Sequence, residues 1–163
     1  MNVLCAIGIQ GGPEVVQRVV RALGSGQALH LLHVIDAGPR HTLEAFLRGP
    51  GPRRRARPPP PPGRAQPIDR AEEEAGAAAL EEARREAERA GVHFSAQVER
   101  GRPEQIIVRI AQERRCDLTA IQANEGAEGR PRLGPDSVGH TARFVLDHAP
   151  CDVFLLRAPV SVP

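Results

Sequence analysis

The sequence contains no lysine, tryptophan or tyrosine, and each absence excludes a class of chemistry. Without lysine there is no P-loop lysine, no Schiff-base lysine and no lysine general base. Four phenylalanines are the only residues with a benzene ring, so the chain lacks the stacking platforms that single-stranded nucleic-acid binders use. The net charge of +2 is also too small to indicate nucleic acid as a partner.

Long apolar runs and paired cysteines are missing as well. Every apolar run is far shorter than the ~20 residues that a membrane-spanning helix needs, so we expect no membrane span. Cys5, Cys116 and Cys151 are widely spaced, and each lies in or beside an apolar run, as is typical of small buried thiols. An odd number of cysteines without a signal peptide favours a reducing compartment, so we expect a cytoplasmic protein. No grouping of ligating side chains predicts a metal site.

What the sequence does contain is a regular alternation of strand and helix patterns. Unbroken apolar runs predict buried strands, and a polar–apolar alternation predicts one more. Between them, apolar residues recur at helical spacing, with Pro13, Asp69 and Pro103 at the predicted helix starts. The predicted strands are residues 3–9, 28–35, 93–98, 118–121 and 153–156, and the main helices are residues 13–23, 69–90, 103 onward and 138–148. This order predicts a doubly wound, Rossmann-like sheet of five parallel strands with helices on both faces.

A Pro/Arg-rich segment at about residues 49–67 interrupts this alternation. It includes five consecutive prolines at positions 58–62, which favour extended polyproline II structure. We interpret the chain as a single domain over residues 1–163 with a disordered insertion there. The arginines leave a second interpretation open, in which the insertion docks to an acidic protein or another anionic surface.

A glycine pattern follows the fourth predicted strand. Gly126 and Gly129 are followed after nine residues by Gly139, which gives the spacing Gly-x2-Gly-x9-Gly. Glycines let backbone N–H groups approach a phosphate, and the last helix begins directly afterwards. Ligands of open parallel sheets bind beyond the carboxyl ends of the strands, where this pattern lies. The same glycines are also typical of turns in a polar loop, so both interpretations stay open.

Three segments in order resemble the universal stress protein (UspA-like) family. They are Leu-Leu-His-Val at 31–34, Gly-Arg-Pro-Glu-Gln-Ile-Ile at 101–107, and His-Ala-Pro-Cys-Asp-Val-Phe-Leu-Leu-Arg at 148–157. The resemblance covers nearly the whole chain except the insertion. It implies the strand order 3-2-1-4-5 and a homodimer formed through the last strand. It also implies a division into members that bind ATP, with Mg, and members that do not.

The resemblance assigns a set of nucleotide-binding positions to this chain. Contacts to adenosine fall on Val34 and Gln122, and contacts to phosphate fall on the loop that ends at the last helix. The phosphate positions are Gly126, Gly129, Gly139, His140 and Thr141, with His140 where the family has serine or threonine. Two further positions depart from the ATP-binding pattern. Gly8 stands where an aspartate helps to hold the nucleotide, and Gln122 stands where the family's register places the first glycine.

Catalytic motifs are absent from the sequence. There is no Gly-x-Ser-x-Gly, and the first strand is followed by Gln-Gly-Gly-Pro-Glu at 10–14 instead of the Ser-Gly-Gly-x-Asp-Ser loop of AMP-forming enzymes. We therefore expect a non-enzymatic regulatory or protective binding module of the stress response, one that need not bind nucleotide. The alternative is an ATP-binding stress sensor that uses the displaced glycine loop. A slow ATP hydrolase is the third hypothesis.

Overall fold

The computed structural model describes residues 1–36, 67–123 and 138–157 of the chain. The described elements alternate between strand and helix along the chain. They are β1 (Asn2–Ile7), α1 (Gly12–Leu23), β2 (Ala28–Asp36), α3 (Pro67–Arg89), β3 (His93–Gly101), α4 (Pro103–Glu113), β4 (Leu118–Gln122), α5 (His140–His148) and β5 (Asp152–Leu156). Residues 49–66 of the predicted insertion, Gly126 and Gly129 lie outside the described residues.

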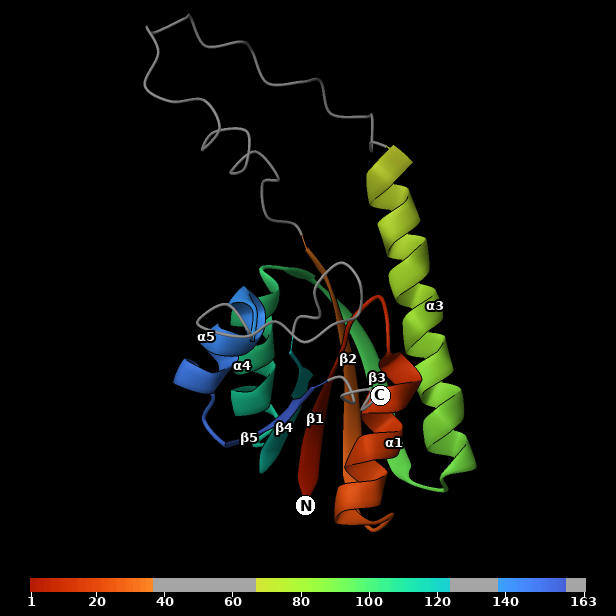
Figure 1. The fold of residues 1–163 in the computed structure, drawn as a ribbon, viewed down its shortest axis with the longest axis vertical. Coiled ribbons are helices and arrows are strands. Elements are labelled where there is room, and N and C mark those ends of the chain that lie inside the picture. The colour runs from red at the N-terminus through yellow and green to blue at the C-terminus, as the bar shows by residue number, and fades with distance from the viewer. Residues whose placement is uncertain (37–66, 124–137, 158–163) are drawn as a thin grey trace, which may run out of the picture.

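The five strands form one parallel sheet in the order β3-β2-β1-β4-β5. Helices α1 and α3 cover one face of the sheet, and α4 and α5 cover the other (Figure 1). This arrangement confirms the predicted doubly wound fold. The strands differ in length, since β2 and β3 have nine residues each while β4 and β5 have five. The carboxyl end of the sheet is therefore stepped.

Strand β1 lies at the centre of the sheet and explains why its sequence is an unbroken apolar run. Val3, Cys5 and Ile7 face the core under α1 and α3, while Leu4 and Ala6 face the core under α4 and α5. A strand buried on both faces has no position for a polar side chain. Its amino end is fixed to β4 by two hydrogen bonds. The Asn2 N–H donates to Asp117 Oδ2 at 2.7 Å, and the Asp117 N–H donates to the Asn2 carbonyl at 2.8 Å.

Two glycines let α3 lie unusually close to its neighbours α1 and β2. A Cβ placed on Gly12, the first residue of α1, would lie 2.7 Å from the Ala79 carbonyl oxygen of α3. A Cβ on Gly76, one turn earlier in α3, would lie 2.0 Å from His33 Nε2 of β2. Real Cβ atoms do not approach other atoms so closely, so α3 can take this position only because both residues are glycine. Figure 1 shows that α3 extends past the carboxyl ends of the strands.

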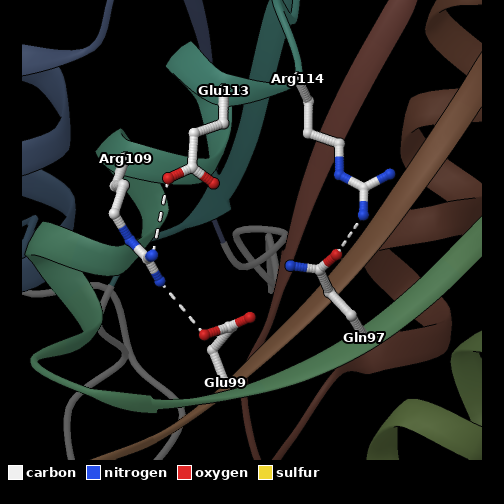
Figure 2. A network of polar contacts seen from close by, with 5 residues as sticks. All are labelled: Gln97, Glu99, Arg109, Glu113 and Arg114. Carbon is white, nitrogen blue, oxygen red and sulfur yellow. Dashed lines mark hydrogen bonds and ion pairs between the residues drawn. The ribbon is translucent and has the colours of Figure 1, made fainter.

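On the opposite face, β3 is joined to α4 by polar contacts (Figure 2). Arg109 forms ion pairs with Glu99 of β3 at 3.1 Å and with Glu113 of α4 at 3.5 Å. Arg114, directly after α4, donates a hydrogen bond to the Gln97 side chain. These side chains are largely exposed, and exposed ion pairs contribute less than about 1 kcal/mol each. The network orients α4 over the edge of the sheet, and apolar packing supplies most of the stability.

Helix and strand boundaries differ from the sequence predictions by a few residues. Asp69 was predicted to cap α3, but the helix begins two residues earlier, at Pro67. Proline is favoured in the first turn because its missing N–H has no partner there in any case. Strand β3 runs to Gly101, beyond the predicted end at Val98, because it pairs with β2 as far as Asp36.

Candidate functional site

A cavity of about 240 Å³ lies at the carboxyl ends of β1, β2 and β4. The strand order reverses between β1 and β4, which is where ligands of doubly wound sheets bind. Most of the surface is aliphatic, with a few polar groups at its edges. The lining residues are Ala6, Ile7, Gly8, Leu32, His33, Val34, Pro103, Ile107, Ile121, Gln122 and Thr141. None of these described lining residues carries a permanent charge, so the cavity favours an uncharged ligand group.

One wall of the cavity is formed where β2 extends beyond the end of β1. The pairing of β2 with β1 ends at His33, whereas its pairing with β3 continues to Asp36. Beyond His33, the described residues place no strand along the β1 side of β2. Backbone groups that a strand would have paired need another hydrogen-bonding partner. Val34 lies at this step and lines the cavity, so its surroundings suit a hydrogen-bonding ligand.

Among the described lining residues, His33 is the one titratable side chain, and it is almost completely buried. Its Nδ1 lies 2.8 Å from the Ile7 carbonyl oxygen. Because a carbonyl can only accept, Nδ1 carries the proton and donates this bond. Nε2 faces the Gly76 backbone of α3. The ring therefore connects the end of β1 to α3 at the edge of the cavity.

Gln122 ends β4, and its amide packs against the loop that precedes α1. A Cβ placed on Gly11 would lie 2.5 Å from Gln122 Nε2 and 3.1 Å from Oε1. Gly11 has a φ of 74°, a left-handed conformation that glycine adopts without strain, and it is the N-cap residue of α1. The amide therefore covers the start of α1, where side chains larger than glycine would collide with it.

The start of α5 lies beside the cavity through Thr141, a lining residue. Gly139 is the N-cap residue of this helix and has a φ of 83°. His140 is exposed, and its Nε2 lies 3.8 Å from Glu104 Oε1 in the first turn of α4. The Glu104 side chain is only 12% exposed. A carboxylate therefore lies close to a helix start that would otherwise attract anions.

The structure brings together five of the seven sequence-predicted site positions. Val34, Gln122 and Thr141 line the cavity, while Gly139 and His140 begin the adjacent helix. Gly126 and Gly129 lie outside the described residues. The sequence did not predict that Pro103, Ile107 and His33 line the cavity. Strand alternation places His33 opposite His30 but gives no sign of the ring's contact with α3.

Other reactive side chains are placed away from this cavity. His30 Nδ1 lies 2.7 Å from Ser95 Oγ on the β2–β3 surface, and burial lowers the pKa of His30, with Arg114 and His93 adding to the effect. Burial raises the pKa of the Cys5 thiol to about 12 and that of Cys116 to about 11, with neighbouring cysteines adding smaller effects. Such thiols stay protonated and unreactive at neutral pH.

The described residues contain neither a cluster of metal ligands nor a membrane-spanning helix. Within residues 1–36, 67–123 and 138–157, no cluster of three or more His, Cys, Asp or Glu side chains could hold a metal ion. No helix in the described part of the chain is long and apolar enough to cross a membrane.

Solved structures of low sequence identity share this fold. The universal stress protein UspA from Lactobacillus plantarum is 21% identical, with a TM-score of 0.67 over 96% of this chain and 97% of that one. A universal stress protein family protein from Arabidopsis thaliana with AMP bound is 17% identical, with a TM-score of 0.61 over 98% and 93%. A universal stress protein in complex with cAMP is 18% identical, with a TM-score of 0.63 over 98% of both chains.

The family is established by the sequence itself. No protein of curated function matches the chain. The model of the universal stress protein family, in contrast, matches residues 1–157, which include every described element. The strand order, the cavity at the β1/β4 reversal and the closing segment that ends at Arg157 agree with this match. The chain therefore belongs to the universal stress protein family.

Proposed function

We propose that this protein is a non-catalytic regulatory module whose cavity receives the adenosine part of an adenine nucleotide. The observation that carries the proposal is the uncharged, largely aliphatic cavity at the point where the strand order reverses. Its volume of about 240 Å³ is slightly below the roughly 300–1,000 Å³ of drug-sized ligand pockets. A nucleoside suits such a space, because its base is planar and apolar on both faces while its edges form hydrogen bonds.

The placement of the polar groups supports this ligand class. Val34 lies where β2 continues past β1, at a position that suits contact with a base edge. Gln122 and Thr141 line the cavity near the starts of α1 and α5. A phosphate attached to the nucleoside would lie near backbone N–H groups at one of these helix starts. The AMP and cAMP complexes of two structural neighbours agree with this assignment.

A second candidate is a module that works without nucleotide. Gly8 favours it, since this residue replaces the acid that the ATP-binding branch of the family is expected to carry at the end of the first strand. In that case regulation would depend on association alone. We propose a cytoplasmic homodimer formed through the edge strand β5, with an acidic protein as partner of the arginine-rich segment at 49–67. Sedimentation equilibrium at micromolar concentration tests the dimer, and a monomer would contradict it.

Thermal unfolding of the purified protein tests the nucleotide proposal. A ligand at about 100 times its dissociation constant stabilises the native state by ~2.7 kcal/mol. For a domain of this size the melting temperature should rise by roughly 5 °C or more. We expect this rise with millimolar adenosine, AMP or cAMP and none with guanosine or GMP. No rise with any of the three adenine ligands would leave the nucleotide-free module as the function.

A further inference from the structure

Gln122 occupies the space between the cavity and the N-terminus of α1. Its side chain lines the cavity, and its amide contacts the backbone of Gly11 closely enough to exclude a Cβ there. A neutral amide therefore lies against Gly11, the residue that caps α1. Helix starts of this kind attract phosphate when they are open. In this chain the Gln122 amide blocks the side of that helix start that faces the nucleoside cavity, while Pro13 and Glu14 line a second cavity on another side.

The other helix start beside the cavity is flanked by a carboxylate. Glu104 Oε1 lies 3.8 Å from His140 Nε2, and the Glu104 side chain is largely buried. Each added phosphate brings further negative charge toward this carboxylate, and like charges repel most strongly where water is scarce. A phosphate at the start of α5 would lie near Glu104, and each additional phosphate would extend toward this carboxylate or toward the Gln122 amide.

From these contacts we infer that Gln122 sets the length and charge of the ligand. The site takes adenosine or an adenosine monophosphate, the cyclic form included, and discriminates against the triphosphate. The inference rests on the proposed function, because it requires a nucleoside in the cavity. Gln122 acts by filling the space that the β- and γ-phosphates would occupy, and Glu104 adds electrostatic repulsion. A glycine at position 122 would open the route to the start of α1.

Isothermal titration calorimetry on the full chain measures this selectivity. Adenosine, AMP, cAMP and Mg-ATP are each titrated into the wild-type protein and into Gln122→Gly. We expect the wild-type protein to bind ATP at least tenfold more weakly than AMP. In Gln122→Gly this ratio should shrink by about tenfold, because the amide no longer blocks the start of α1. Gln122→Ala should give a smaller change in the same direction. It replaces the glycine variant in the titrations if that variant is unstable.

Two further variants separate the local effect from a general one. Gln97→Gly is the matched control, because Gln97 is also a half-buried strand glutamine but bonds to Arg114 on β3 and does not line the cavity. It should leave the ratio of ATP to AMP affinity unchanged. Gln122→Glu keeps the size of the side chain and adds a negative charge. It should weaken AMP binding at least fivefold while adenosine binding changes less than twofold.

The outcomes distinguish this inference from the proposed function. If the wild-type protein binds ATP as tightly as AMP, or if Gln122→Gly and Gln122→Ala leave the ratio unchanged, the assignment of Gln122 is wrong while the nucleotide site stands. If a folded wild-type protein binds none of the four ligands, the proposed function is wrong and the inference falls with it.

Discussion

Replacement of Gly76 by alanine should destabilise the protein, although alanine is the better helix former. Gly76 lies in the middle of α3, where glycine costs about 1 kcal/mol relative to alanine. An exposed site would gain that amount on substitution. At Gly76, however, the new Cβ would lie 2.0 Å from His33 Nε2 and 2.6 Å from Cε1. The ring or the helix must move, and a shift of the ring disturbs its hydrogen bond to the Ile7 carbonyl.

The cost of this movement can be estimated from its parts. Overpacking of a filled core costs about 1–3 kcal/mol. Displacement of the ring also breaks the 2.8 Å hydrogen bond to the Ile7 carbonyl, which is worth ~1 kcal/mol, with more lost if the carbonyl stays buried without a partner. Against the gain of about 1 kcal/mol in helix propensity, we expect a net loss of roughly 1–3 kcal/mol.

Urea denaturation followed by circular dichroism measures the effect. The matched control is Ala78→Gly, at an exposed position of the same helix, which reports the helix propensity alone and should cost about 1 kcal/mol. His33→Ala in the background of Gly76→Ala should recover part of the loss, because it removes the atoms that collide. A Gly76→Ala variant more stable than the wild-type protein would refute the argument. It would mean that the contact between α3 and His33 does not restrict the helix.

Two further predictions concern charge. Gly8→Asp should raise the affinity for adenosine about tenfold in calorimetry, because a carboxylate bound to a ribose hydroxyl contributes ~1.5–3 kcal/mol. The side chain fits, since the nearest atom to an added Cβ, the Gln10 carbonyl oxygen, is at an ordinary contact distance of 3.6 Å. Unchanged affinity would show that the ribose lies elsewhere. The free energy of unfolding should begin to fall near pH 8 and continue to fall toward pH 11. The reason is that the pKa of Cys5 is raised to about 12 and that of Cys116 to about 11 in the folded state, from 9.0, so the thiols ionise first in the unfolded chain. The sequence contains no lysine or tyrosine that would titrate in that window. A urea series across it in the wild-type protein and in Cys116→Ala measures the slope, which should be smaller in the variant.

The sequence predicts the elements well because local patterns determine them. The strand predicted at residues 3–9 is observed as Asn2–Ile7, and the helix predicted from Pro103 begins at that residue. The strand order came from the resemblance, since periodicity does not say which strands are neighbours. Helix and strand ends were less accurate, because they depend on partners elsewhere in the chain. Strand β3 is longer than its alternating pattern because β2 supplies partners up to Asp36.

The site was predictable in position but not in detail. Val34 and Thr141 came from the resemblance, and the structure places both beside one cavity at the carboxyl end of the sheet. The contact of His33 with Gly76 and that of Gln122 with Gly11 join residues more than 40 positions apart. Neither contact leaves a local signal, since a glycine in a helix and a glutamine after a strand are unremarkable in sequence.

The hydrogen bonds that join Asn2 to Asp117 have a consequence for biosynthesis. Strand β1 is translated first, but its second neighbour, β4, begins at Leu118, and the two bonded residues are 115 positions apart. At about 5–20 residues per second, the ribosome takes roughly 6–23 s to cover that distance. During this interval β1, α1, β2, α3 and β3 can assemble, yet one long edge of the central strand stays open. An open edge is a template for pairing with another chain. The nascent chain is therefore most prone to misassociation while it is still on the ribosome, before β4 emerges.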